Sequence, residues 1–133
     1  MSAIYLAARF SRRHEANALA NELKDRGHSI TSRWVLPHLD NVEPIGPSAQ
    51  AADEARALFA QEDIDDILAC DTVVSLMEEP RSNGRGGRHV EFGIGLGLGK
   101  RLVIIGPRET VFHHLPAIEH FETTAAYLES LHA

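Results

Sequence analysis

Hydrophobic residues recur along the chain in short runs and in helical stripes that alternate with each other, which predicts a series of strands and helices. The apolar run Ala3–Ala7 ends in charged residues and predicts a buried strand. Similar β-branched or apolar runs predict further strands at His28–Trp34, Thr72–Met77, Arg101–Gly106 and Glu119–Thr123. Apolar positions at helical spacing predict helices over Ser11–Arg26, Ala49–Ala69 and Thr124–His132.

Local signals mark where these elements begin and end. Ser11 is the expected N-cap of the first helix and Gly27 its expected stop, and Thr123 or Thr124 caps the last helix. The predicted apolar stripe of the middle helix comprises Ala55, Leu58, Phe59, Ile64, Ile67 and Leu68. Proline and glycine content predicts loops over Leu36–Pro47 and Glu79–Gly87.

The segment His89–Gly99 fits two structures, because glycine occupies every second position from 93 to 99. Each glycine in a helix costs about 1 kcal/mol relative to alanine, and strict alternation also suits a strand. We predict a helix, because another strand here would break the alternation of strands and helices. Gly93 and Gly97 would then share a face against which another element packs closely.

The order of elements predicts an α/β fold in one domain, residues 1–133, with an open parallel sheet between helices on both faces. Such sheets bind ligands at the carboxyl ends of their strands. The functional residues are therefore expected in four segments, Ala7–Ser11, Trp34–Asp40, Glu78–Arg88 and Gly106–His114.

Composition and charge narrow the class of protein. The net charge of −6 over 133 residues argues against a surface for polymeric nucleic acid. Cys70 is the only cysteine, and the eight histidines show no metal-ligand spacing. No apolar run approaches the roughly 20 residues that span a bilayer, and the N-terminus lacks the charge order of a secretory signal. We therefore expect a cytoplasmic protein without a metal, a cofactor or a membrane partner.

The junction between the glycine-rich loop and the helix that follows it is the strongest candidate site. Gly86 and Gly87 let the backbone approach a ligand, and a helix start offers free N–H groups to an anion. Arg85 and Arg88 can pair with a phosphate in bidentate fashion. Glu91 is expected in the first helical turn, where the dipole stabilises the ionised form that a carboxylate nucleophile requires. The alternative is that Glu91 only complements the helix dipole.

A second group of acids lies near the end of the helix Ala49–Ala69. Asp63 and Asp66 share a helix face with Ile67, so at least one of them is expected beside the apolar stripe. An acid near the ligand edge of the sheet can orient or protonate a substrate. For Asp66 and Asp71, simple solvation and strand entry are favoured over catalysis.

Three motifs, in this order, resemble the nucleoside 2-deoxyribosyltransferase superfamily over nearly the whole chain. They are Ile4-Tyr5-Leu6-Ala7, the pattern D-x-x-x-I-x-x-C-D from Asp63 to Asp71, and H-V-E-F-G from His89 to Gly93 followed by Gly99-Lys100. The resemblance implies a flavodoxin-like, Rossmann-like three-layer sandwich that needs no metal. It also implies cleavage of the N-glycosidic bond of nucleosides, or of their 5′-monophosphates, through a covalent glycosyl-enzyme.

The same resemblance implies roles for single residues. Glu91 would be the nucleophile at the anomeric carbon, and Asp63 the acid that helps to protonate the leaving base. Tyr5 would contact the nucleophile or the sugar, and Phe10 would stack on the base. Ala7 and His89, which lie within the matching motifs, are expected to contact the substrate.

One departure from the family pattern concerns the substrate. Superfamily members that act on unphosphorylated nucleosides carry an aspartate about six residues before the nucleophile, and this chain has Arg85 there. The segment Arg81–Arg88 therefore looks more like the branch that hydrolyses nucleoside 5′-monophosphates. Arg12 and Arg13 are expected to supply further contacts to the phosphate or the base.

The resemblance also implies a homodimer or a larger homo-oligomer whose sites are completed by a neighbouring chain. His113 or His114, in the loop after the fourth predicted strand, would reach the partner's pocket. Two other functions remain open: a nucleotide-binding sensor without catalysis, and a phosphoribohydrolase of cytokinin activation. The second is disfavoured because Glu91 lies five residues after Gly86, not seven, and no Gly-Thr pair is present.

Overall fold

The computed structural model describes residues 1–36, 49–78 and 86–131. Within these ranges five parallel strands form one open sheet in the order β2-β1-β3-β4-β5. The strands are β1 (Ala3–Ala7), β2 (Ser29–Ile30), β3 (Thr72–Leu76), β4 (Arg101–Ile105) and β5 (Glu119–Phe121). The predicted α/β class and open parallel sheet are confirmed.

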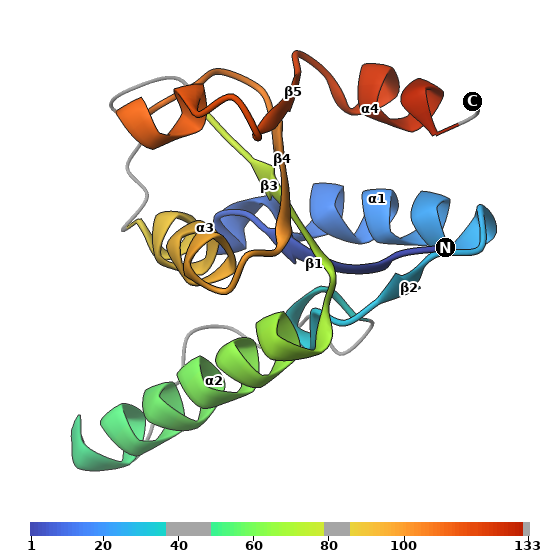
Figure 1. Cartoon of the computed structure of the whole chain (residues 1–133). Coiled ribbons are helices and arrows are strands. Elements are labelled where there is room, and N and C mark those ends of the chain that lie inside the picture. The colour runs from blue at the N-terminus through green and yellow to red at the C-terminus, as the bar shows by residue number, and fades with distance from the viewer. Residues whose placement is uncertain (37–48, 79–85, 132–133) are drawn as a thin grey trace.

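Helices cover both faces of the sheet, which gives three layers (Figure 1). One face carries α1 (Arg13–Asp25) and α4 (Thr124–Ser130), and the other carries α2 (Ala49–Ala69) and α3 (Gly87–Gly97). Among the described residues, three 3-10 turns lie between these elements: η1 (Phe10–Arg12), η2 (Arg33–Val35) and η3 (Val111–His114). In the described part of the chain, no helix is long and apolar enough to cross a membrane.

The core has two halves, one on each face of the sheet, because successive strand residues point to opposite faces. Leu6, Val74 and Val103 pack toward α1 and α4. Tyr5, Val73 and Ile104 pack toward α2 and α3.

The strand order places the ligand crevice. The chain moves outward from β1 to β2 and then returns to β3 on the other side of β1, so the strand order reverses between β1 and β3. Their carboxyl ends therefore form the crevice where open α/β sheets bind ligands.

The second strand is shorter than predicted, because side chains replace its backbone in pairing with β1. Only Ser29 and Ile30 are in strand conformation. Beyond them, the Ser32 hydroxyl accepts a hydrogen bond from the backbone N–H of Leu6 (3.0 Å), and the indole N–H of Trp34 donates to the Leu6 carbonyl (2.8 Å). Leu6 thus has its hydrogen bonds without a longer β2.

One prediction about the helices is wrong and three are confirmed. Ser11 is not a cap, because η1 precedes α1 and the helix begins at Arg13 without a side-chain cap. Gly27 ends the first helix region with φ +90°, and the Thr123 side chain caps α4 by accepting from the backbone N–H of Ala126 (3.1 Å). The helix over Ala49–Ala69 has the predicted bounds.

The apolar stripe predicted on α2 is largely exposed. Of its members Ile67 is buried, whereas the large side chains of Leu58, Phe59, Ile64 and Leu68 are exposed. Figure 1 shows that the first half of α2 extends past the edge of the sheet, so among the described elements this half has no sheet or helix layer to pack on. The pattern therefore marks an apolar surface rather than a core.

The glycine-rich segment is a helix, as predicted, but the close contact is made by a different glycine. A Cβ at position 95 would lie 2.8 Å from Cγ2 of Val73 and 3.1 Å from Cδ2 of Leu102. Among the described residues, a Cβ at Gly93 or Gly97 would meet nothing within 4 Å. Gly95 thus lets α3 lie close against β3 and β4, and the prediction for Gly93 and Gly97 is wrong.

Candidate active site

A tyrosine and two carboxyl side chains, from three different elements, meet beside the crevice at the carboxyl ends of β1 and β3. Tyr5 comes from the middle of β1 and is fully buried. Asp63 comes from α2 and Glu91 from α3. The Tyr5 hydroxyl lies close enough to both carboxyl groups to lower the pKa of each, although it forms no hydrogen bond of ordinary geometry with either. The structure thus brings together the three residues that the resemblance implies for catalysis.

Glu91 is placed differently from the expectation in two respects. It is the fifth residue of α3, so it lies in the second turn and not in the first. Burial, more than the nearby Asp63 charge, raises its pKa to about 8, even though the Tyr5 hydroxyl acts in the opposite direction. The expected stabilisation of the ionised form by the helix dipole is therefore wrong, because desolvation outweighs it.

Asp63 also holds its proton more tightly than an exposed aspartate. Burial, the Asp66 charge and the Glu62 charge raise its pKa to about 6, against the opposing effects of Arg33 and the Tyr5 hydroxyl. Between about pH 6 and pH 8 the Glu91–Asp63 pair therefore carries one proton. Because the two groups interact, these values belong to the pair.

Several buried polar atoms near this pair have no hydrogen-bond partner among the described residues. They include the Tyr5 hydroxyl, Oε2 of Glu91 and the Ser75 hydroxyl. Ser75 lies on β3 opposite Ala7 of β1, on the same face of the sheet as Tyr5. Unpaired buried groups of this kind require a partner, and a polar ligand in the crevice would provide it. Sequence reasoning missed Ser75, although it is the one polar residue within the run Val73–Met77.

The start of α3 has the backbone geometry expected of a ligand loop. Gly86 is the N-cap and adopts a left-handed conformation (φ +84°) that other residues rarely take. A Cβ at Gly87 would lie 4.0 Å from Oε1 of Glu91, so this carboxylate oxygen faces the helix start. Arg85, with the rest of the predicted loop from 79 to 85, lies outside the described residues.

Arg88 is buried and paired with acids of the same chain. Its side chain is 3% exposed, and Nη2 donates to Oε1 of Glu109 (2.7 Å). Nη1 lies 3.8 Å from Oε2 of Glu78, whose carboxylate also pairs with Arg9 (3.1 Å). The sequence pattern did not reveal Glu109, because it lies 21 residues after Arg88. Its charge balances the Arg88 charge that was expected to face a phosphate.

The residues after β1 are only partly directed at the crevice. Phe10 is 40% exposed, and the Arg13 guanidinium lies over its ring (4.6 Å to the ring centre). The Arg12 guanidinium pairs with Glu15 and donates to the Met77 carbonyl (3.1 Å). Phe10 is thus available for stacking, whereas Arg12 is already engaged.

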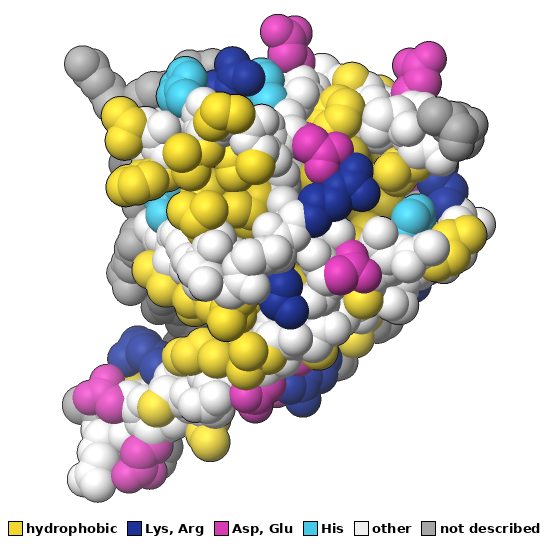
Figure 2. Space-filling model, viewed as in Figure 1, with side chains coloured by type: hydrophobic (Ala, Val, Ile, Leu, Met, Phe, Trp, Pro, Cys, Tyr) yellow, Lys and Arg dark blue, Asp and Glu magenta, His cyan; other side chains and the backbone are white. Residues whose placement is uncertain are grey.

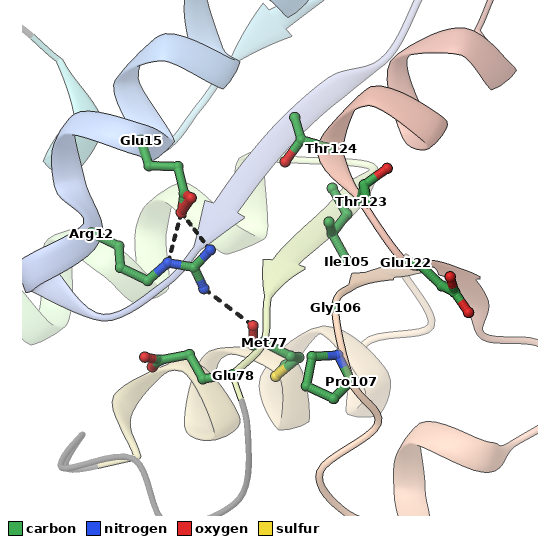
Figure 3. Close-up of a pocket in the computed structure, with 10 residues that line it drawn as sticks. All are labelled: Arg12, Glu15, Met77, Glu78, Ile105, Gly106, Pro107, Glu122, Thr123 and Thr124. Carbon is green, nitrogen blue, oxygen red and sulfur yellow. Dashed lines mark hydrogen bonds and ion pairs between the residues drawn. The ribbon is translucent and has the colours of Figure 1, made fainter.

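Arg12 lines a pocket of about 430 Å³ at the same sheet edge (Figure 3). The pocket lies on the face of α1 and α4, across the sheet from Glu91, and is lined by Arg12, Glu15, Met77, Glu78, Ile105, Gly106, Pro107, Glu122, Thr123 and Thr124. Figure 3 shows the Arg12 side chain directed at Glu15 and Met77. The pocket is separate from the Glu91–Asp63 pair.

The histidines near the start of α3 have different environments. His113 is buried, and its Nδ1 accepts from the backbone N–H groups of Glu109 (3.0 Å) and Thr110 (3.3 Å). Its ring packs on Phe92 and on His89, with ring centres 4.9 and 5.7 Å apart. His114 is exposed. His113 therefore cannot reach a partner chain without leaving its own core, whereas His114 can.

The remaining acids have structural positions. Asp66 is buried and accepts hydrogen bonds from the backbone N–H and the Nε of Arg33, both at 2.9 Å. The expectation that Asp66 is solvated is wrong, because this residue holds α2 against η2. Asp71 accepts from the backbone N–H of Ala3 (2.9 Å), which confirms the predicted role at strand entry. Within the described ranges, no group of three or more His, Cys, Asp or Glu side chains is arranged to hold a metal ion.

Fold and site together define an open α/β sandwich with a partly buried carboxyl pair at its ligand edge, and solved structures share this fold. The chain is similar to the CMP N-glycosidase BcmB of Clostridium botulinum, with 19% identity, a TM-score of 0.61 and 97% of each chain covered. It is also similar to a 2-deoxyribosyltransferase from the psychrotolerant bacterium Bacillus psychrosaccharolyticus, with 19% identity and a TM-score of 0.65. That alignment covers 94% of this chain and 89% of the other.

These likenesses establish the flavodoxin-like fold that the resemblance to the nucleoside 2-deoxyribosyltransferase superfamily implies. No protein-family model matches the sequence, and no curated protein matches it significantly.

Proposed function

We propose that this protein cleaves the N-glycosidic bond of a nucleoside or 2′-deoxynucleoside, or of its 5′-monophosphate, through a covalent glycosyl-Glu91 intermediate. The observation that carries the proposal is the partly buried Glu91–Asp63 pair with the Tyr5 hydroxyl close to both carboxyl groups. Two carboxyl groups, one ionised and one protonated, are what a double displacement at an anomeric carbon requires. The two similar structures, an N-glycosidase and a deoxyribosyltransferase, support this class of reaction.

In the first step, an oxygen of ionised Glu91 forms a bond to C1′ as the bond from C1′ to the base nitrogen breaks. The electron pair of the broken bond stays on the base, and Asp63 donates the proton that neutralises it. In the second step, water or another base attacks C1′, the Glu91–C1′ bond breaks, and Asp63 takes up the proton from the attacking group. Both steps invert C1′, so the overall configuration is retained.

The pKa values explain why Tyr5 matters to this sequence of steps. Burial favours the proton on Glu91, because it raises the Glu91 pKa to about 8 and the Asp63 pKa only to about 6. Reaction needs the proton on Asp63 and the charge on Glu91. The Tyr5 hydroxyl, which lies near both carboxyl groups, stabilises either charge, and the developing positive charge of the sugar favours ionised Glu91.

Substrate contacts follow from the surroundings of the pair. We assign Phe10 and Arg13 to the base, the Gly86–Gly87 backbone to the sugar and His89 to the 5′ substituent, with Arg85 added on its place in the sequence alone. Ala7 has no exposed surface and lies in the core behind the site, so the expected contact from Ala7 to the substrate is not made. Arg88 is held by Glu109 and Arg12 by Glu15, so we assign the preference for a 5′-phosphate to Arg85, on its place in the sequence. Polymeric nucleic acid is not a substrate, because the chain has a net charge of −6.

The protein acts as a homodimer or larger homo-oligomer through an exposed apolar surface, which we name the α2–α3–η3 surface. It comprises Leu58, Phe59, Ile64, Leu68, Val90, Leu96, Leu98, Val111, Phe112 and Leu115. Figure 2 shows hydrophobic side chains gathered over α3 and η3 and along α2. Exposed apolar patches of this extent mark interaction surfaces. His114, which adjoins Phe112 and Leu115 in the chain, reaches the partner's site.

A panel of nucleosides and 5′-monophosphates, ribo and deoxy, tests the proposed reaction by base release with and without an acceptor base. The wild type is expected to release base from at least one member, and Glu91→Gln from none. Tight nucleotide binding without turnover of any member would contradict the proposal and favour a sensor.

A further inference from the structure

Glu109, in the loop between β4 and β5, joins three segments at the ligand edge of the sheet. Its side chain is 9% exposed. Oε2 accepts a hydrogen bond from the backbone N–H of Glu78 (2.8 Å), directly after β3. Oε1 accepts from Nη2 of Arg88 (2.7 Å) and lies 3.6 Å from Nε2 of His89, both in the first turn of α3. One carboxylate thus contacts the end of a central strand and the start of the helix that carries Glu91.

Glu109 is also linked to the core of α3 and, through Glu78, to the segment after β1. Its own backbone N–H donates to Nδ1 of the buried His113 (3.0 Å), which packs on Phe92 of α3. The Glu78 carboxylate pairs with Arg9 (3.1 Å), just after β1. The charges therefore alternate in space across the ends of β1 and β3, the start of α3 and the loop after β4.

Glu109 remains ionised in this position. Burial acts to raise its pKa, but the backbone N–H of Glu78 and the guanidinium of Arg88 outweigh that effect, and the pKa lies below the usual value for glutamate. An ionised, buried carboxylate with directed donors holds those donors in a fixed geometry. Arg88 is one of them, and Glu91 follows it by three residues on the same side of the helix.

We propose that Glu109 is a positioning residue, which fixes the start of α3 against the end of β3 and thereby places the Glu91 carboxylate. The inference rests on the proposed function, because placing Glu91 matters for catalysis only if Glu91 reacts. Glu109 itself does not touch the reacting atoms. Misplacement of a reacting group by about 1 Å can cost roughly 100-fold in rate, so loss of this contact is expected to lower kcat.

The test compares Glu109→Gln with Glu119→Gln. Glutamine at 109 keeps the size of the side chain and an oxygen that can accept from Glu78, but it loses the charge that pairs with Arg88. Glu119 pairs with Arg101 through two hydrogen bonds, one of them 2.7 Å. Both residues lie at the amino-terminal ends of β4 and β5, at the other end of the strands from the ligand crevice. Glu119→Gln therefore controls for the loss of an ion pair. Glu109→Asp, which keeps the charge on a shorter side chain, serves as a second variant if Glu109→Gln does not fold.

Amide hydrogen exchange over residues 87–92 and the steady-state constants for base release are measured on each variant. Loss of Glu109 is expected to speed exchange at the start of α3 and to lower kcat about 10- to 100-fold, with a much smaller change in KM. Glu119→Gln is expected to change neither. Unchanged exchange at α3, or a kcat no lower than that of Glu119→Gln, would overturn the proposal. If the wild type releases no base, the proposed function fails, and the exchange data alone decide whether Glu109 holds α3.

Discussion

Glu91 and Asp63 lie together in a partly buried site although they come from different helices. Burial raises the pKa of Glu91 to about 8, with a smaller contribution from the Asp63 charge, and burial raises that of Asp63 to about 6. Paired acids with separated pKa values are a common sign of an acid and a nucleophile in one site. Their protonation should therefore control both activity and stability.

The first prediction concerns the pH dependence of base release. Below about pH 6 both groups are protonated and no nucleophile is present, and above about pH 8 both are ionised and no acid is present. We expect a bell-shaped profile of kcat/KM with limbs near these values. A profile that stays flat from pH 5 to pH 9 would contradict this account of the pair.

Tyr5→Phe tests the same prediction. The Tyr5 hydroxyl lowers the pKa of both carboxyl groups, so its loss should move both limbs of the profile to higher pH. We expect kcat to fall roughly 10-fold or more, because the developing charge on Glu91 loses a hydrogen-bond donor. Tyr127→Phe is the matched control, since Tyr127 is also buried but lies in the core half on the α1–α4 face. It should leave the profile unchanged.

The raised pKa of Glu91 also predicts a cost in stability at alkaline pH. The folded protein binds the Glu91 proton up to about pH 8, whereas the unfolded chain releases it near pH 4.5. The free energy of unfolding should therefore fall as the pH rises between these values. Glu91→Gln cannot ionise, so at pH 9 we expect it to be more stable than the wild type by roughly 1–3 kcal/mol.

Thermal unfolding from pH 4.5 to pH 9 measures this difference. Glu119→Gln should instead be less stable than the wild type at neutral pH. The ion pair with Arg101 lowers the Glu119 pKa and so stabilises the fold while Glu119 is ionised. Equal loss of stability with pH in the wild type and in Glu91→Gln would show that Glu91 is not buried with a raised pKa.

Two neighbouring glycines of α3 should respond in opposite ways to alanine. At Gly95 a Cβ would lie 2.8 Å from Val73, so Gly95→Ala should destabilise the fold by about 1–3 kcal/mol. At Gly93 no described atom lies within 4 Å of a Cβ, so Gly93→Ala should stabilise it by about 0.5–1 kcal/mol. Chemical denaturation of both variants measures these changes. Similar effects at both positions would mean that α3 does not pack on β3 through Gly95.

Assembly through the α2–α3–η3 surface gives the next prediction. Leu58 is 73% exposed on α2, so Leu58→Glu should weaken the oligomer by placing a charge in its apolar contact. Asp53→Ser, on the same helix, should leave it intact, because Asp53 already carries a charge in solvent. Light scattering at several concentrations distinguishes the states. A monomeric wild type with full activity would refute the proposed assembly.

The sequence predicted the order and type of most elements, because strand and helix periodicities are local. It failed where distant segments decide the structure. β2 is short because Ser32 and Trp34 satisfy the backbone of Leu6, and the apolar stripe of α2 is exposed because the helix extends past the sheet. The hydrogen bond between Asp66 and Arg33, which lie 33 residues apart, has no local signal in the sequence either.

For the site, matching motifs identified Tyr5, Asp63 and Glu91, and the structure brings these three together. Their protonation did not follow from sequence, because the pKa of Glu91 depends on burial by other elements. Glu109 and Ser75 were missed for related reasons. The first acts over a long sequence separation, and the second is one serine within an apolar strand.

The most direct test of the central claim is mass spectrometry of the protein quenched during turnover of the best substrate from the panel. We predict an added glycosyl mass on the peptide that contains Glu91, absent from Glu91→Gln and lost on further incubation with water or an acceptor base. A protein that releases base at full rate without such an adduct, or that carries it on another residue, would contradict the assignment of Glu91 as the nucleophile.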